Sequence, residues 1–220
     1  ENPTKPYTYM YNKNRNIFIQ DCYLIIDYIY LDEEERSRFA NTRHDYLIEQ
    51  LQYSGEKVFD SPNNKINIDF LHPSKFIIWV TQQSFFLNTE INDCFNYTDD
   101  YRYNTKGEQV GYSLINDETL YLNNHERLST RNWVYFNYVQ AYQHFSYDPS
   151  EGINIYSFSL FPEKNSPSST CNMSQINNSF VKFTTFPTIN IQNKGKFRAY
   201  SLGYNIYRIV DGLGGIVFNA

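Results

Sequence analysis

The sequence predicts an all-β fold. Aromatic residues make up 18% of the 220 residues, with 21 Tyr and 17 Phe, and most apolar runs are short and separated by Pro, Gly, Asn and Asp. Aromatic and β-branched side chains favour the half-buried surface of a sheet. A chain of this length is sufficient for one substantial all-β domain with an extension.

The first element is expected over Ile17–Leu31, where β-branched and aromatic residues between two polar runs favour one long strand. Asp32 and Glu35 then have the spacing of a capping box, and the acidic run around them suits the positive end of a helix dipole. Thr42 and Asp45 repeat this spacing and predict a second short helix. These signals predict a short helical connector near the N-terminus.

Further strands are expected in short apolar runs bounded by turn residues. These runs begin at Lys65, Lys75, Gln109, Glu118, Ile153, Phe180 and Phe197. Asn116-Asp117 is expected to form a tight hairpin turn, and residues 129–145 are expected to be loop with one helical turn. The count approaches the eight strands of an antiparallel jelly-roll sandwich, in which two four-stranded sheets close over one core.

Charge and cysteine content argue against several classes of protein. The net charge of -5 provides no basic field for phosphates, so direct nucleic-acid binding is not expected. Cys22, Cys94 and Cys171 are odd in number and lack CxxC spacing, so neither a disulfide framework nor a zinc site is predicted. No apolar stretch approaches the roughly 18 residues of a membrane span, so no membrane insertion is expected.

No catalytic residue, cofactor or metal site is expected. The four histidines, His44, His72, His125 and His144, never occur with HxH or HExxH spacing, which favours structural roles. The glycine-rich run Asp211–Gly215 is not followed by a helix, so a tight turn is predicted rather than a phosphate cradle. The sequence also contains no GxSxG nucleophile elbow.

Three glycan acceptor patterns are present, beginning at Asn96, Asn172 and Asn177. Chance explains most such patterns in a chain this rich in Asn. Only Asn96, in a polar loop, is expected to be an exposed attachment site.

Five blocks resemble, in the same order, the major capsid proteins of nucleocytoplasmic large DNA viruses, a family of double jelly-roll capsid proteins. The blocks are Asp27–Gln52, Phe70–Gln82, Leu120–Phe145, Gly152–Asn178 and Tyr204–Phe218. The most specific is GINIYSFSLFPEKNSPSSTCNMSQINN, which resembles a strand, a proline-marked loop and a PSGTCNFSRI-like strand start. Among the departures, Ser169 stands where the family commonly has Gly, and Phe161 stands where Arg is common.

The resemblance implies a structural subunit of an icosahedral virus shell, forming homotrimeric, pseudo-hexagonal capsomers. The implied partners are copies of the same protein, neighbouring capsomers and minor capsid proteins. The implied location is the virion capsid, with assembly in the host cytoplasm.

The resemblance also implies a division of the chain. Residues 1–31 would provide the last strand of a preceding jelly roll, residues 32–54 the connector, and residues 55–220 the carboxy-terminal jelly roll. The sequence has no initiating Met, so it is expected to be part of a longer polypeptide.

Two alternative functions share the sandwich shape. A carbohydrate-binding jelly-roll module for host attachment would gather exposed aromatic and amide side chains in an open groove. A metal-dependent cupin-like enzyme would need His ligands at spacings that this sequence lacks.

Overall fold

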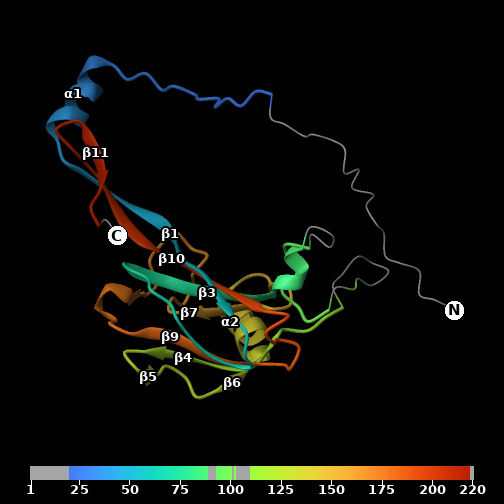
Figure 1. The fold of residues 1–220 in the computed structure, drawn as a ribbon. Helices are drawn as coiled ribbons and strands as arrows, with labels where there is room; N and C mark the ends of the chain where they lie inside the picture. The colour runs from blue at the N-terminus through green and yellow to red at the C-terminus, as the bar shows by residue number, and fades with distance from the viewer. Residues whose placement is uncertain (1–19, 89–92, 101, 103–109, 219–220) are drawn as a thin grey trace.

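The computed structural model describes residues 20–88, 93–100, 102 and 110–218, which form two antiparallel sheets packed face to face (Figure 1). The first sheet has the order β1 (His44–Phe59), β10 (Gly195–Val210), β3 (Pro73–Gln83) and β7 (Ile153–Ser157). Two short strands extend it: β11 (Leu213–Ile216) pairs with β10, and β8 (Cys171–Asn172) pairs with β3.

The second sheet has the order β2 (Asn63–Asn67), β9 (Ser179–Thr185), β4 (Ile115–Leu122) and β5 (His125–Glu126). The two-residue strand β6 (Arg131–Asn132) also pairs with β4, so β5 and β6 share the edge position. The result is two sheets of four strand positions, which is the jelly-roll arrangement. The predicted fold class is confirmed.

The helix expected after residue 31 is present as α1 (Glu33–Asn41). Asp32 caps it, because its Oδ1 accepts a hydrogen bond from the Glu35 backbone N–H at 2.8 Å. The stretch expected to be mostly loop holds more helix than predicted: a π-helix over Tyr135–Val139 leads directly into α2 (Gln140–His144).

The prediction of a second short helix at Thr42 and Asp45 is wrong, because His44 begins the 16-residue strand β1. That strand is antiparallel to β10 along its length, from His44 opposite Ile209 to Phe59 opposite Gly195. A side-chain cap is worth only about 1 kcal/mol. The continuous ladder with β10 outweighs this local preference.

The strand expected over Ile17–Leu31 is not formed in the part that the structure describes. Residues 17–19 lie outside the described residues, and residues 20–31 have no strand assignment and are exposed. A strand needs a neighbour to satisfy its backbone N–H and C=O groups. No described segment of this chain pairs with residues 20–31, so they remain extended without a ladder.

The hairpin turn predicted at Asn116-Asp117 is also wrong, since both residues lie within β4. The register against β9 shifts between Ile115 and Asp117, so the chain forms an irregularity there instead of reversing. Of the strand expected from Gln109, the last residue, Ile115, begins β4, and the described residues before it make an isolated bridge between Ser113 and Thr98.

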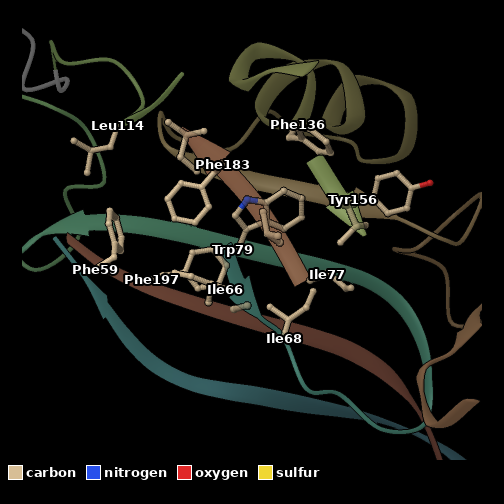
Figure 2. Close-up of a cluster of buried hydrophobic side chains, with 14 of the residues drawn as sticks. Phe59, Ile66, Ile68, Ile77, Trp79, Leu114, Phe136, Tyr156, Phe183 and Phe197 are labelled. Carbon is tan, nitrogen blue, oxygen red and sulfur yellow. The ribbon is translucent and has the colours of Figure 1, made fainter. Parts of the chain in front are cut away.

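Aromatic rings from both sheets meet at the centre of the core (Figure 2). Trp79 of β3 is fully buried and packs edge-on against Phe136, with ring centroids 5.2 Å apart. Phe183 of β9 stacks on Phe197 of β10 at 5.6 Å and meets Phe59 of β1 edge-on at 5.3 Å. Such ring pairs stabilise the fold beyond the contribution of their buried apolar area. They join the two sheets directly.

One acidic residue, Glu118 of β4, lies inside this core. Trp79 Nε1 donates a hydrogen bond to Glu118 Oε2 at 2.7 Å, and Oε1 has no partner among the described residues. Burial raises the pKa of the Glu118 carboxyl from an ordinary value of 4.5 to about 8. The folded protein therefore holds this side chain in its neutral form at neutral pH.

We expect the unsubstituted protein to lose stability as the pH rises, and we expect Glu118→Gln to abolish this loss. The folded pKa is the higher one, so the contribution of neutral Glu118 is complete below 4.5 and is lost as the pH rises towards about 8. Each pH unit in that window lowers the free energy of unfolding by up to about 1.4 kcal/mol. Gln keeps an acceptor oxygen for the Trp79 N–H but has no group that titrates. Urea unfolding of both proteins at a series of pH values measures this, and parallel pH profiles would contradict it.

Ser169 is strained in the position where the resembled family commonly has Gly. Its φ is +94°, in the region that L-residues rarely adopt. We expect Ser169→Gly to raise the free energy of unfolding by about 0.5–1 kcal/mol, because glycine has no Cβ to clash there. Urea unfolding measures this gain. Ser166→Gly in the same loop is the control and should not stabilise the protein. No gain in the free energy of unfolding for Ser169→Gly would argue against strain.

Candidate assembly surfaces

β1 and β10 continue beyond the body of the sandwich as a ribbon that carries β11 and α1 at its far end (Figure 1). The ribbon turns back at Asp211 and Gly212, whose φ angles are +52° and +74°. A two-residue hairpin of the primed type needs this backbone, which Asp-Gly favours. The tight turn predicted for the glycine-rich run is confirmed.

The outer face of β1 and β10, turned away from the second sheet, carries apolar side chains interspersed with charged ones. On β10 the buried residues Phe197, Ala199 and Ser201 alternate with half-buried ones, so the half-buried residues face outward. Their partners on β1 share that face. We define the outer face of β1 and β10 by its apolar members: Leu47, Leu51, Tyr53, Val58, Tyr200, Leu202 and Ile206.

Three aliphatic side chains of this face are more than half exposed. Leu51 is 65% exposed, Val58 58% and Leu47 55%. Leu51 lies opposite Leu202 and Leu47 opposite Ile206 in the ladder, so their side chains are neighbours. Contiguous apolar surface of this kind marks a contact site.

The carboxylates on this face are paired with cations of the same protein. The pairs are Glu56 with Lys196 and Arg198, Asp45 with Arg208 and Arg43, and Glu49 with Lys75, all at 2.5–2.9 Å. Arg208 and Arg43 hold the pKa of Asp45 at about 2 through hydrogen bonds, and Lys196 lowers the pKa of Glu56 in the same way. The face therefore presents balanced charges between its apolar side chains.

Lys75 is the buried member of these pairs and is only 1% exposed. Its Nζ lies 2.5 Å from Glu49 Oε1, 3.3 Å from the Lys164 carbonyl oxygen and 5.2 Å from the centre of the Tyr204 ring. The Lys75 carbonyl oxygen accepts the backbone N–H groups of Phe158 and Ser159. Through these contacts, Lys75 of β3 links the loop after β7 to β1 and β10.

The outer face of the second sheet is polar by comparison. Lys65 and Lys182 lie directly opposite each other in the ladder of β2 and β9, and both are exposed. The ring of Phe180 on the same face is covered by Lys65, whose Nζ lies 4.0 Å above it, and by the stacked ring of Tyr121 at 4.5 Å. Two lysines opposite each other repel unless water separates them. The outer face of the second sheet is thus less apolar than that of the first.

A second exposed apolar group lies beside the π-helix. The ring of Trp133 lies 6.4 Å from Tyr112 and 6.0 Å from Tyr138, and Tyr112 is 64% exposed. Burial and a hydrogen bond to Glu151 raise the pKa of Tyr138, so its hydroxyl stays protonated.

A pocket of about 680 Å³ lies where β3 ends and β10 begins. It is lined by Gln83, Ser84, Phe85, Leu87, Asn88, Gln192 and Asn193. Four of these side chains are amides and one is aromatic. The cluster of Tyr112, Trp133 and Tyr138 does not contribute to it.

The expectation that Asn96 is exposed is wrong, since the side chain is fully buried. Its Nδ2 donates to Asp93 Oδ2 at 2.9 Å and to the Asp100 carbonyl oxygen at 2.8 Å, while its Oδ1 accepts from Thr98. Gln82 below it also donates to the Asn96 carbonyl oxygen. A glycan on Nδ2 would require these contacts to break, which the sequence pattern alone could not reveal.

The structure does not bring the histidines and cysteines together as a site. No group of three or more His, Cys, Asp or Glu side chains gathers as metal ligands among the residues searched, which are the described ones. Cys22 and Cys94 are exposed, and burial raises the pKa of the half-buried Cys171 thiol. Within the described chain, no helix has the length and apolar content needed to cross a membrane.

We expect Glu49→Ala to be more damaging than Lys75→Met. Removing Glu49 leaves the buried Lys75 ammonium without its carboxylate, whereas removing Lys75 leaves a carboxylate that is 37% exposed and reaches water. The difference in the free energy of unfolding should be about 2 kcal/mol or more. Urea unfolding measures it. Asp69→Ala, at an exposed pair with Lys57, is the control with little effect; equal losses for Glu49→Ala and Lys75→Met would contradict the argument.

This chain is similar in sequence to known viral capsid proteins. The family described as large eukaryotic DNA virus major capsid protein matches residues 35–215. Probable capsid protein 4 of Acanthamoeba polyphaga mimivirus is 37% identical over 91% of this chain and 39% of its own length. The major capsid protein of Pyramimonas orientalis virus is 35% identical over 89% of this chain and 48% of its own length. The chain thus spans about half the length of the curated relatives it matches.

Solved structures agree in fold. A subunit of the PBCV-1 virus capsid superimposes with a TM-score of 0.67 at 28% identity, over 88% of this chain and 56% of that one. The Faustovirus major capsid protein superimposes with a TM-score of 0.59 at 12% identity, which supports the fold alone.

Proposed function

This chain belongs to the family of large eukaryotic DNA virus major capsid proteins, and we propose that it acts as a structural subunit of an icosahedral virus shell. In this proposal the full polypeptide forms homotrimers of pseudo-hexagonal outline that contact neighbouring capsomers and minor capsid proteins. The observation that carries it, beyond family membership, is the broad apolar face with balanced charges on β1 and β10. A surface of this kind suits permanent contact with another protein body.

The proposal includes a division of the polypeptide. Residues 1–31 would belong to a preceding jelly roll, and the carboxy-terminal one, expected over residues 55–220, would include the earlier part of β1 as well. Because β1 already begins at His44, the connector between the two would be α1 with its flanking residues, and the second jelly roll would start earlier than residue 55. The greater length of the relatives supports an additional domain.

The proposed role is structural. We expect no catalytic activity, no cofactor, no direct nucleic-acid binding and no membrane insertion. The location would be the virion capsid, with assembly in the host cytoplasm. Relatives are named as capsid proteins, which supports a structural role.

The carbohydrate-binding alternative is favoured by one feature, the amide-lined pocket beside Phe85. Amide side chains are suitable partners for sugar hydroxyls. Against it, the exposed ring of Tyr112 and the half-buried ring of Trp133 lie outside that pocket. A sugar site built on aromatic platforms would place such rings in the groove.

We expect the full-length polypeptide to have the native mass of a trimer and a hexagonal outline. Mass photometry and negative-stain imaging of one sample measure both properties. A protein that stays monomeric at high concentration would count against the shell-subunit proposal, and glycan-array binding would then test the alternative. Phe85→Ala serves as a control, because it should leave the trimer intact under the shell proposal and abolish sugar binding under the alternative.

A further inference from the structure

We propose that the helical segment 135–144 is a lid over a buried polar site that binds ordered water, and that opening of this lid is linked to loss of the Glu118 proton. The segment consists of the π-helix Tyr135–Val139 and helix α2. The site is formed by the side chains of Glu118, Asn154 and Asn137. The inference concerns the inside of one sandwich, so it goes beyond the proposed shell function and does not depend on it.

The first argument is a group of buried polar atoms in the core. Asn154 and Asn137 are fully buried, and Glu118 is only 1% exposed. Among the described residues, no hydrogen-bond partner is found for Glu118 Oε1, for Asn137 Oδ1, or for either Nδ2 or Oδ1 of Asn154. Buried polar atoms of folded proteins are satisfied by protein groups or by ordered water. A site that offers both donors and acceptors suits water, which donates and accepts hydrogen bonds.

The second argument is that these three side chains lie around Trp79. Trp79 Nε1 donates a hydrogen bond to Glu118 Oε2 at 2.7 Å, which brings the carboxyl of the second sheet to the indole. Asn154 lies opposite Trp79 in the ladder of β3 and β7, so its side chain shares the inward face. Asn137 Nδ2 donates to the Ile153 carbonyl oxygen at 2.6 Å, in the peptide that precedes Asn154. The three polar side chains thus line one part of the core.

The third argument is how the helical segment covers this part of the core. Phe136 is fully buried and packs edge-on against Trp79 (Figure 2). The amide side chains of Asn137 and Gln140 attach the segment to β7, whereas β3, β4 and β7 are held by backbone ladders. Opening a segment with few hydrogen bonds costs less than breaking a ladder. Because Asn137 belongs to both the site and this attachment, changes in the site act directly on the lid.

Glu118 has no counter-ion within the described chain. Arg131 of β6 lies opposite it in the ladder, but Arg131 is exposed and its guanidinium lies 5.6 Å from the centre of the Tyr135 ring. Tyr156, on the inward face of β7, accepts a hydrogen bond from Arg127 instead. The other titratable side chains of the helical segment have different partners or are exposed: Tyr138, His144 and Tyr142. The inward side chains of β3, β9 and β10 are uncharged: Ile77, Thr81, Val181, Phe183, Phe197 and Ala199.

This environment links the proton to the lid. Burial raises the pKa of the Glu118 carboxyl to about 8, whereas a hydrated carboxyl keeps the ordinary value of 4.5. An open lid admits water and so favours the ionised carboxyl. Opening therefore becomes easier as the pH rises from 4.5 towards about 8. Tyr142 of the lid is 85% exposed, so a proton in the core alters the surface that this segment presents.

The test is hydrogen exchange of the full-length polypeptide from about pH 5 to about pH 8, measured by mass spectrometry and corrected for the intrinsic pH dependence of exchange. We expect the protection factors of residues 135–144 to fall by up to about tenfold per pH unit and to stay below those of β9. In Glu118→Gln they should not vary with pH, because Gln has no group that titrates. Helix α1 is the internal control: its opening does not expose Glu118, so its protection should not vary either.

Two results would overturn the linked lid. One is protection of residues 135–144 that does not vary with pH. The other is protection equal to that of β9 at every pH, because Glu118 would then reach water only through global unfolding. The measurement on the unsubstituted protein decides this even if Glu118→Gln fails to fold.

A high-resolution crystal structure of the same polypeptide tests the water-binding site directly. We expect an ordered water within hydrogen-bonding distance, about 3.2 Å or less, of Asn154 and of either Glu118 or Asn137. Direct hydrogen bonds between these side chains, or an Asn154 amide with only apolar neighbours, would overturn the site.

Discussion

The ladder between β1 and β10 is the contact on which the rest of the structure depends. It joins a strand near the beginning of the described chain to one near its end, with His44 opposite Ile209. β10 also pairs with β3, so this ladder completes the first sheet. The same ladder extends past the sandwich and supports β11 and the contact of α1 with the ribbon. Fold, projecting ribbon and exposed face are consequences of one long-range pairing.

The core that this ladder closes is held by rings with specific geometry. Phe183 and Phe197 stack across the sheets, and Trp79 both packs against Phe136 and donates to Glu118. A neutral carboxyl satisfies the indole N–H without a buried charge. The acid therefore fits this core only while it is protonated, so core packing and proton binding are linked at one contact.

Local signals predicted local structure well, and non-local contacts account for the errors. Asp32 caps α1 through a neighbour three residues away, which a sequence pattern reveals. Asp45 belongs to a similar pattern, yet its carboxylate pairs with Arg208 far along the chain. Asn96 looked exposed in a polar loop, but its loop folds over Gln82. Short-range pattern cannot encode those partners, because they depend on which strands pair.

Which face of β1 is apolar also depends on strand pairing, and the sequence alone did not reveal it. Leu47 and Leu51 share a face in strand β1, and they would also share one on the predicted helix, so their spacing does not tell the two structures apart. The register with β10 then sets Leu51 beside Leu202 and Glu49 beside Tyr204. Surface chemistry is thus a product of strand register, and a shift of one residue would turn this apolar stripe towards the core and the polar residues outward.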